Sequence, residues 1–280
     1  MKDIIAVTSD WHCNSTLGLC PPELALDDGG MYHASHAQLW LWQHWLEFWS
    51  YVRAKAYPDG HVYAVHNGDL VDIIPQSVQL ISYNETTAVK CALVATTPLQ
   101  GVVQTHFVIR GTQLHTGASG YLEEIVAGVL GAEPCPATGT KSWWHLQLQL
   151  QGVLFDVAHH RSLGHLPWTE VNPMQRLIYE VIAQASANKR PLPQFIVRSH
   201  GHRRADTFDS HPMVRAIATP GWQLTTDYGH RIATNRIPHV GGVVFTITNG
   251  KTVVDTLLYT PQPDLPWLPT QLPKEQISGK

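Results

Sequence analysis

Carboxylate and imidazole side chains recur along this sequence, each time just after a short apolar run. The groups are Asp10 and His12, Asp69, Thr112 to His115, His159, and His200 and His202. Histidine is the commonest metal ligand in proteins, and mixed imidazole and carboxylate ligands suit Zn, Mn or Fe rather than an all-oxygen Ca site. The groups outnumber the four ligands of one tetrahedral ion. The pattern therefore predicts a centre of two metal ions that share a bridging carboxylate.

The run before Asp69 indicates how such a group would be positioned. Residues 62–65 are apolar and partly β-branched or aromatic, and the run stops at Asn67-Gly68-Asp69. This predicts a buried strand that ends in a carboxylate. Ligands bind at the carboxyl edge of open α/β sheets, and Gly68 would let other groups approach the carboxylate closely.

Two of the groups are spaced as pairs. Residues two apart in an extended segment project to the same side. Asp10-x-His12 and His200-x-His202 can therefore each direct two ligands into one site. A single Asp-x-His pair is common by chance, whereas a series of such groups at successive strand ends carries much more weight.

The elements that must position these groups follow from hydrophobic periodicity. The first half predicts three strands, each followed by a helix, which is typical of a parallel α/β arrangement. The expected strands are Ile4 to Thr8, residues 62–69 and Thr105 to Arg110, and the expected helices are Ala34 to Ala56, residues 85–100 and Ser119 to Leu130. Proline, glycine and aspartate residues predict a loop over residues 13–33.

The first expected helix is rich in tryptophan. It carries Trp40, Trp42, Trp45 and Trp49. Apolar residues cover most of its circumference, which predicts burial on more than one side. The aromatic cluster favours core or dimer packing over a base-stacking platform.

The second half of the chain contains more strands. Gln151-Gly152 indicates a hairpin between the alternating residues 143–149 and a strand over Val153 to Ala158. A further helix and several strands are expected at Met174 to Ala187, at Phe195 to Arg198 and around residues 213–218, 243–248 and 252–259. Because no repeat and no domain boundary is visible, we predict a single domain over residues 1–259 and a proline-rich tail over residues 260–280.

The overall composition limits the classes of partner. The 280 residues carry a net charge of −3 with neutral histidines, so binding of extended duplex nucleic acid is not expected. The four cysteines show no Cys-x-x-Cys pairing, which favours reduced structural thiols. No apolar run resembles a signal peptide or approaches the ~18 residues of a membrane span. We expect a cytoplasmic protein without a membrane partner, and the tryptophans and the tail are compatible with a homodimer.

In order and spacing, the groups resemble the motif blocks of the calcineurin-like metallophosphoesterases. That family carries Asp-x-His, Gly-Asp, Gly-Asn-His, a lone His and Gly-His-x-His in this order. The corresponding residues here are Asp10-Trp11-His12, Gly68-Asp69, Gly111-Thr112, His159 and His200-Gly201-His202. The resemblance spans residues 4–204 and implies a four-layer α/β/β/α sandwich with two central mixed β-sheets.

The resemblance also implies how the ligands are divided between two divalent ions. One ion would be held by Asp10, His12, Asp69 and His202, and the other by Asp69, His159 and His200, with Asp69 as the bridge. His159, and not His160, corresponds to the lone histidine of the family. We expect Mn first, with Zn, Fe or Ni as alternatives.

The third block departs from the family pattern. Thr112 stands where the family has an asparagine ligand, and Gln113 stands where it has the histidine that protonates the leaving group. A Gly-Thr-x-x-His block is similar to that of some phage and prophage relatives. His115 is then either a ligand of the second metal or the general acid, and the alternative is a loop residue without a role. Thr112 either binds through its hydroxyl or caps the following turn.

The expected chemistry follows from the metals. Two ions ~3.5–4 Å apart clamp phosphoryl oxygens and make hydroxide available near neutral pH. We therefore expect a dinuclear phosphodiesterase acting on a small phosphate ester, such as a nucleotide or cyclic nucleotide, with Asp69 holding both ions and His115 as proton donor. The alternatives are a phosphomonoesterase, a nucleotide phosphatase or a nuclease on the same site, or a noncatalytic scaffold of this fold.

Several other polar residues lie near the motif blocks. Asp72 is expected to orient a ligand histidine. Arg203 and Arg204 either neutralise a further phosphate or form a solvated pair on a loop. His160, His165 and His230 are candidates to line the substrate cleft.

Overall fold

The fold is described from a computed structural model, which covers residues 2–74, 79–162, 164, 169–233 and 237–261. Most of the predicted tail, from residue 262 on, and His165 lie outside the described residues. No helix in the described part of the chain is long and apolar enough to cross a membrane.

The first sheet has six strands in the order β13-β12-β1-β4-β5-β6. Four of them run parallel to one another, namely β1 (Lys2–Thr8), β4 (His61–Asn67), β5 (Thr105–Ile109) and β6 (Ser142–Trp143). Of the other two, β12 (Val240–Thr248) pairs antiparallel with β1, and β13 (Lys251–Tyr259) pairs antiparallel with β12 at the edge of the sheet. The parallel arrangement predicted for the first half is confirmed.

The second sheet has five strands in the order β10-β11-β9-β8-β7. They are β7 (Leu146–Leu150), β8 (Val153–Val157), β9 (Phe195–Arg198), β10 (Ala205–Asp206) and β11 (Arg215–Ala218). Gln151 and Gly152 both have positive φ between β7 and β8, as a tight hairpin turn requires. The predicted hairpin is therefore confirmed, and both sheets of this α/β protein are mixed.

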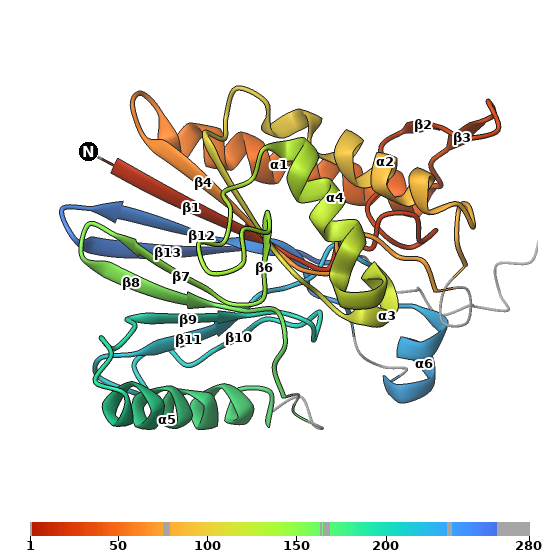
Figure 1. Cartoon of the computed structure of the whole chain (residues 1–280). Helices are drawn as coiled ribbons and strands as arrows, with labels where there is room; N and C mark the ends of the chain where they lie inside the picture. The colour runs from red at the N-terminus through yellow and green to blue at the C-terminus, as the bar shows by residue number, and fades with distance from the viewer. Residues whose placement is uncertain (1, 75–78, 163, 165–168, 234–236, 262–280) are drawn as a thin grey trace, which may run out of the picture.

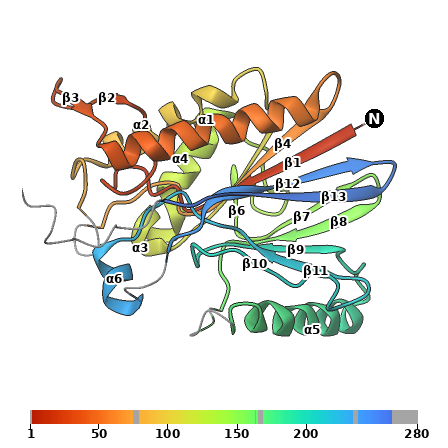
Figure 2. The ribbon, with the colours of Figure 1, turned by 180° about the vertical axis from the view of Figure 1, so that it is seen from behind.

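Helices cover the outer faces of the two sheets (Figures 1 and 2). The helices α1 (His36–Ala56), α2 (Glu85–Ala95) and α4 (Tyr121–Leu130) lie over the first sheet, and α5 (Asn172–Ala187) lies over the second. Successive residues of a strand point to opposite faces. Ile4 and Ala6 accordingly pack in the core beneath the helices, and Ile5 and Val7 pack between the sheets. A third core joins α5 to the second sheet.

Helix α1 differs from its prediction. It begins after Ser35, whose side chain accepts a hydrogen bond from the Gln38 backbone in a capping box. Trp45 and Trp49 are buried in the core, as expected from their type, but Leu39 and Leu46 are exposed. The helix therefore buries one face only, because it lies on the outside of the first sheet.

The segment predicted as a loop over residues 13–33 is only partly irregular. It contains the antiparallel strands β2 (Glu23–Ala25) and β3 (Met31–His33). Leu26 and Gly30 close the turn between them through a backbone hydrogen bond of 2.8 Å. The two strands are too short to show an alternating pattern in the sequence.

Candidate metal centre

The loops that follow five strands meet at one edge of the molecule. Asp10 and His12 follow β1, Asp69 follows β4, Thr112 follows β5, His159 follows β8, and His200 and His202 follow β9. Backbone hydrogen bonds join these loops: the Asp10 amide donates to the Gly68 carbonyl at 2.8 Å, and the Ser199 amide donates to the His159 carbonyl at 2.8 Å. The predicted strand-end residues therefore come together from both sheets.

The backbone at this edge is unusually constrained. The residues with positive φ include Asp10 (52°), His12 (45°), Asp69 (55°), His200 (69°) and His202 (50°). This left-handed conformation is uncommon for residues other than glycine, and it clusters at functional sites, where the surrounding structure enforces it. The loops thus hold these side chains in fixed directions.

We call Asp10, His12 and His202 the first half of the centre. Asp10 is fully buried, and neither of its carboxylate oxygens has a hydrogen-bond partner among the described residues. The Nε2 atom of His202 lies 3.4 Å from Asp10 Oδ1 and 3.2 Å from His12 Nε2. Two imidazole ligands of one tetrahedral ion would stand ~3.3 Å apart at the usual metal–nitrogen distance.

The protonation state of His202 also makes the first half suitable for binding a cation. Burial lowers the pKa of His202 to about 4, so at neutral pH its ring is uncharged. Its lone pair is then available to a metal ion. A buried carboxylate beside such a ring needs a cation to compensate its charge.

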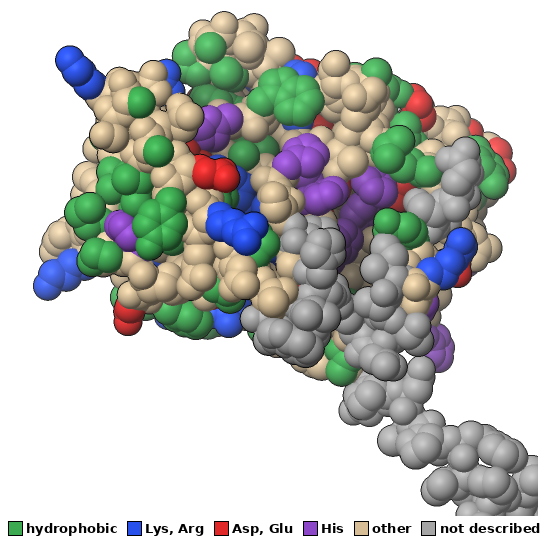
Figure 3. All heavy atoms as spheres, turned by 90° about the horizontal axis from the view of Figure 1, so that it is seen from below, with side chains coloured by type: hydrophobic (Ala, Val, Ile, Leu, Met, Phe, Trp, Pro, Cys, Tyr) green, Lys and Arg blue, Asp and Glu red, His purple; other side chains and the backbone are tan. Residues whose placement is uncertain are grey.

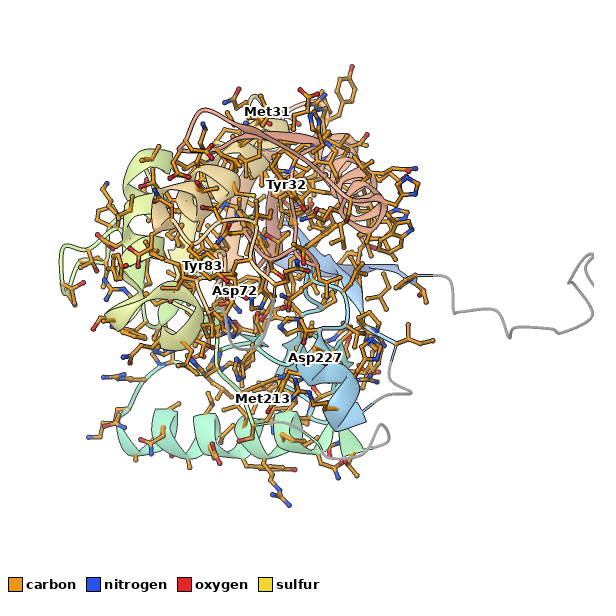
Figure 4. The ribbon with its side chains drawn as sticks, turned by 90° about the vertical axis from the view of Figure 1, so that its right-hand side faces the viewer. Met31, Tyr32, Asp72, Tyr83, Met213 and Asp227 are labelled. Atoms are coloured by element: carbon orange, nitrogen blue, oxygen red, sulfur yellow. The ribbon has the colours of Figure 1, made fainter. Side chains whose placement is uncertain are left out.

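Asp72 connects two of the histidines. Its Oδ2 lies 3.2 Å from His12 Nδ1, and its Oδ1 lies 3.3 Å from His115 Nδ1. A carboxylate that binds one ring nitrogen fixes the tautomer and the direction of the other. Burial raises the pKa of Asp72, but the close contacts with His115 and His12 outweigh burial and hold it well below its usual value. Asp72 lies in the middle of the face that Figure 4 shows.

We call His159, His200 and Thr112 the second half of the centre, with Asp69 between the two halves. Asp69 Oδ2 accepts a hydrogen bond of 3.1 Å from the Thr112 hydroxyl, and it lies 3.0 Å from His159 Nε2 and 3.9 Å from His200 Nδ1. Thr112 Oγ1 is also 3.1 Å from His200 Nδ1. Thr112 occupies the N-cap position of helix α3 (Gln113–Thr116), but its hydroxyl makes no capping hydrogen bond there; the hydroxyl faces Asp69 and His200 instead.

His159 is charged in this arrangement. Burial lowers its pKa, but the charge of Asp69 and the hydrogen bond to it raise the pKa to about 10. The Nδ1 of the same ring lies 2.6 Å from the Asn67 carbonyl, to which it donates. His159 is therefore held at both nitrogens.

The described residues contain four groups of three side chains that could hold a metal ion. In each group the ligand atoms lie within 4.8 Å of one another. The groups are Asp10, His12 and His202; Asp10, Asp69 and His159; His12, Asp69 and His115; and His159, His160 and His200. Figure 3 shows histidine side chains gathered in one place on this face. The predicted carboxylates and imidazoles are thus within reach of one another, and His160 joins them although it was expected only in the cleft wall.

Glycines allow this close approach. A Cβ atom at Gly68 would stand 2.4 Å from His159 Nδ1, and one at Gly111 would stand 2.2 Å from Asp69 Oδ1. A Cβ atom at Gly221 would stand 3.1 Å from His202 Nδ1 and from the Asp10 Cβ. The sequence pointed to the first of these, but Gly221 was missed because it follows β11, far along the chain.

Glu123 was also missed as part of the site. It is fully buried on α4, and it accepts hydrogen bonds from the Gly111 amide at 2.6 Å and the Leu70 amide at 3.2 Å. Burial and the charge of Asp69 raise its pKa to about 8. The only sequence signal was an acidic residue in the first turn of a helix, which usually indicates a solvated face.

Arg203 and Arg204 are not a solvated pair, contrary to one of the two expectations. Arg203 Nε lies 3.3 Å from Glu170 Oε1, and Arg204 pairs with Asp206 at 2.8 Å. Both arginine side chains are mostly buried. His230 is exposed on α6 (Asp227–Ala233), in a part of the face marked by Asp227 in Figure 4.

Comparison with known proteins gives only distant similarities. No protein-family model and no curated protein matches the sequence. Vacuolar protein sorting 29 from Cryptosporidium parvum is 10% identical with a TM-score of 0.43, over 93% of this chain and 99% of that chain. A Thermotoga maritima protein solved by solution NMR is 12% identical with a TM-score of 0.40, over 92% and 99%. The sulfate thiohydrolase SoxB of Thermus thermophilus is 12% identical with a TM-score of 0.39, over 98% of this chain and 58% of that chain. These values assign the chain to no family, and its function has to be inferred from the site itself.

Proposed function

We propose that this protein is a dinuclear metal-dependent phosphodiesterase of the calcineurin-like metallophosphoesterases, with their four-layer sandwich fold and a single domain. The ordered motif blocks support this proposal, and so does the convergence of their side chains at one edge. We further propose that it acts in the cytoplasm on a small phosphate diester, such as a cyclic nucleotide or dinucleotide.

The observation that carries the proposal is the burial of the Asp10 carboxylate without a hydrogen-bond partner. Both of its oxygens are buried and have no hydrogen-bond partner in the described part of the chain, while neutral His202 lies 3.4 Å away. A buried charge without a partner is costly unless a cation compensates it. Imidazole and carboxylate atoms together are a ligand set that fits Mn, Zn or Fe.

The division of ligands follows the two halves of the site. Asp10, His12, Asp69 and His202 would hold one divalent ion, and Asp69, His159 and His200 would hold the other, with the Thr112 hydroxyl beside them. The ions, when bound, would supply Lewis-acid polarisation of the phosphoryl group and a water molecule of lowered pKa. The chain supplies the rest: Asp72 fixes the ring of His12, and the left-handed loops fix the directions of the ligands.

His115 is the residue that would protonate the leaving group. Burial lowers its pKa, but the close contact with Asp72 and the charges of Asp69 and Asp10 raise it above the ordinary value. The protonated form of the ring is therefore favoured more than in a free imidazole. Its side chain remains 21% exposed, and its centroid lies 4.6 Å from that of His12. A partly exposed ring of raised pKa beside the ligands suits the role of a general acid.

Hydrolysis of two chromogenic substrates tests this function. The full chain is stripped with chelator, dialysed, and assayed with bis(p-nitrophenyl) phosphate and with p-nitrophenyl phosphate after addition of Mn²⁺. We expect restored activity that favours the diester. A preference for the monoester would replace the proposal with a phosphomonoesterase.

The matched control is Asp10→Asn, which keeps the size of the side chain and removes its charge. We expect it to lose metal-restored activity on both substrates. Absence of activity in the unaltered chain with each of Mn²⁺, Zn²⁺, Ni²⁺ and Fe²⁺ would instead favour the noncatalytic scaffold.

A further inference from the structure

Three histidine rings lie together beside Asp69. His159 and His160 follow β8, and His200 follows β9. The ring centroids of His159 and His160 are 4.9 Å apart, and the centroid of His200 lies 5.3 Å from each of them. One nitrogen of each ring lies within 4.8 Å of one nitrogen of the other two. The three rings therefore form a nearly equilateral triangle.

The size of this triangle fits one shared ion. Three imidazole ligands of a tetrahedral ion would place their ring centroids ~5 Å apart at the usual metal–nitrogen distance. His159 Nδ1 lies 2.6 Å from the Asn67 carbonyl, so its Nε2, which is 3.0 Å from Asp69 Oδ2, is the nitrogen that remains for an ion. The triangle thus adjoins the carboxylate that the two halves share.

The second half needs a further ligand, because the Thr112 side chain is a poor one. Its hydroxyl lies 3.1 Å from Asp69 Oδ2 and 3.1 Å from His200 Nδ1, so hydrogen bonds already engage it. Ions such as Zn, Fe and Ni are held in proteins by imidazole, thiolate and carboxylate groups and not by neutral alcohols. Without the hydroxyl, the chain would offer this ion only Asp69, His159 and His200.

His160 is placed to supply the missing ligand. Unlike the buried His159, it is exposed, so its ring is free to turn toward an ion without disturbing the core. We propose that His160 is the third imidazole ligand of the ion in the second half, together with His159, His200 and Asp69. This inference rests on the proposed dinuclear centre, and it adds a ligand that the motif blocks do not contain.

The added ligand makes the two halves chemically different. The first half then offers two carboxylates and two imidazoles, whereas the second offers one carboxylate and three imidazoles. Imidazole suits Zn, Fe, Ni and Cu, and carboxylate suits Mn. The second half should therefore select Zn²⁺ over Mn²⁺ more strongly than the first half does.

Calorimetric titration of the chelator-stripped full chain, with Zn²⁺ and with Mn²⁺ separately, tests this proposal. We expect two binding steps in the unaltered chain. His160→Ala should weaken one step for Zn²⁺ about tenfold or more, since even the neighbours of metal ligands change affinity by that much, and leave the other step within about twofold. The unchanged step also shows that the variant is folded. The control is His33→Ala on β3, where the side chain is 70% exposed, and it should change neither step.

A second variant separates a ligand from a structural ring. His160→Glu replaces an imidazole nitrogen with a carboxylate oxygen. At the affected step it should bind Mn²⁺ as tightly as the unaltered chain does and Zn²⁺ about tenfold more weakly. A structural role would not change the preference between the two metals, so loss of both metals alike in His160→Glu would overturn the proposal.

The remaining outcomes distinguish this inference from the proposed function. Two steps that His160→Ala leaves unchanged would overturn the role of His160 and leave the dinuclear centre standing. Equal weakening of both steps would also overturn it, because the ring would then support the whole edge. A single step or none in the unaltered chain would overturn the dinuclear centre itself, and the inference with it.

Discussion

The two halves of the metal centre differ in how the chain itself engages their ligand atoms. In the first half, the Asp10 oxygens have no hydrogen-bond partner among the described residues, and burial keeps His202 neutral. In the second half, Asp69 Oδ2 accepts from Thr112 and pairs with a protonated His159. An ion that enters the first half has to replace only the contact between the His12 and His202 rings, but in the second half it has to displace the proton of His159 and the ion pair of His159 with Asp69.

This difference predicts an order of binding. Metal affinity depends on deprotonating the ligands, and binding releases the protons they hold. At neutral pH the His202 ring of the first half is already uncharged, whereas the His159 ring of the second half still carries a proton that the ion has to displace. The centre should therefore bind one ion tightly and the other more weakly, and the unusual Thr112 lies on the weaker side.

The largest effect is expected from substitution of Asp69, the residue that the two halves share. Asp69→Asn should lose both ions and lower turnover by about 10³-fold or more, because several kcal/mol of transition-state stabilisation depend on the ions. Turnover of the diester and bound metal, measured by elemental analysis of the dialysed protein, check this. Retention of one ion at full occupancy would show that Asp69 belongs to one half only.

His115→Ala tests a residue that stands beside the first half through Asp72. It should slow esters with poor leaving groups by about 10²- to 10³-fold, the usual size of general acid catalysis, and affect p-nitrophenyl esters much less. The measurement is a series of aryl diesters of increasing leaving-group pKa. Gln113→Ala, two residues away in the same short helix, is the matched control and should leave the series unchanged. An equal loss on all esters would limit His115 to a structural or ligand role.

The pH dependence of metal binding distinguishes the two halves most directly. Because the pKa of His159 is raised to about 10, binding to the second half has to release its proton below that pH. The apparent affinity of the weaker ion should rise about tenfold for each pH unit between pH 6 and pH 8, by proton linkage. The pKa of His202 lies near 4, so that ring has no proton to release in this range.

Calorimetric titration with Mn²⁺ in two buffers of different ionisation enthalpy measures the protons released at each step. We expect about one more proton for the weaker step than for the tighter step. Equal proton release at both steps would contradict the assignment of a charged His159 to the weaker half.

The smallest expected effect comes from Thr112. Thr112→Asn places an amide oxygen near His200 and should strengthen binding of the weaker ion about tenfold, in the range found for neighbours of metal ligands. Thr112→Val keeps the shape of the side chain and removes the hydroxyl that contacts Asp69 and His200, so it should weaken the same step. If neither substitution changes the weaker step, Thr112 does not belong to the second half.

The sequence allowed the ligand positions to be predicted because they follow local rules. Each group stands directly after a strand, and parallel strands bring their carboxyl ends to one edge. Glu123 and Gly221 were not predictable in the same way, because each is defined by a contact with a distant loop. The pairing of Arg203 with Glu170 was not predictable for the same reason.

Helix α1 shows a different limit of the sequence. Its apolar residues cover most of the circumference, but apolar residues are common on protein surfaces, and exposure is set by what lies outside the helix. The sequence could place Trp45 and Trp49 in a core by their type. It could not show that Leu39 and Leu46 would meet solvent.

The position of β12 has a consequence for how the protein is made. Strand β1 lies between β4 and β12, and the Trp222 amide donates to the Asp10 carbonyl at 2.9 Å. A chain that has left the ribosome only as far as His202 already contains every ligand, yet the strand that leads to Asp10 still has an open edge. Its neighbour is synthesised later. Metal loading should therefore follow synthesis of the chain and not accompany it.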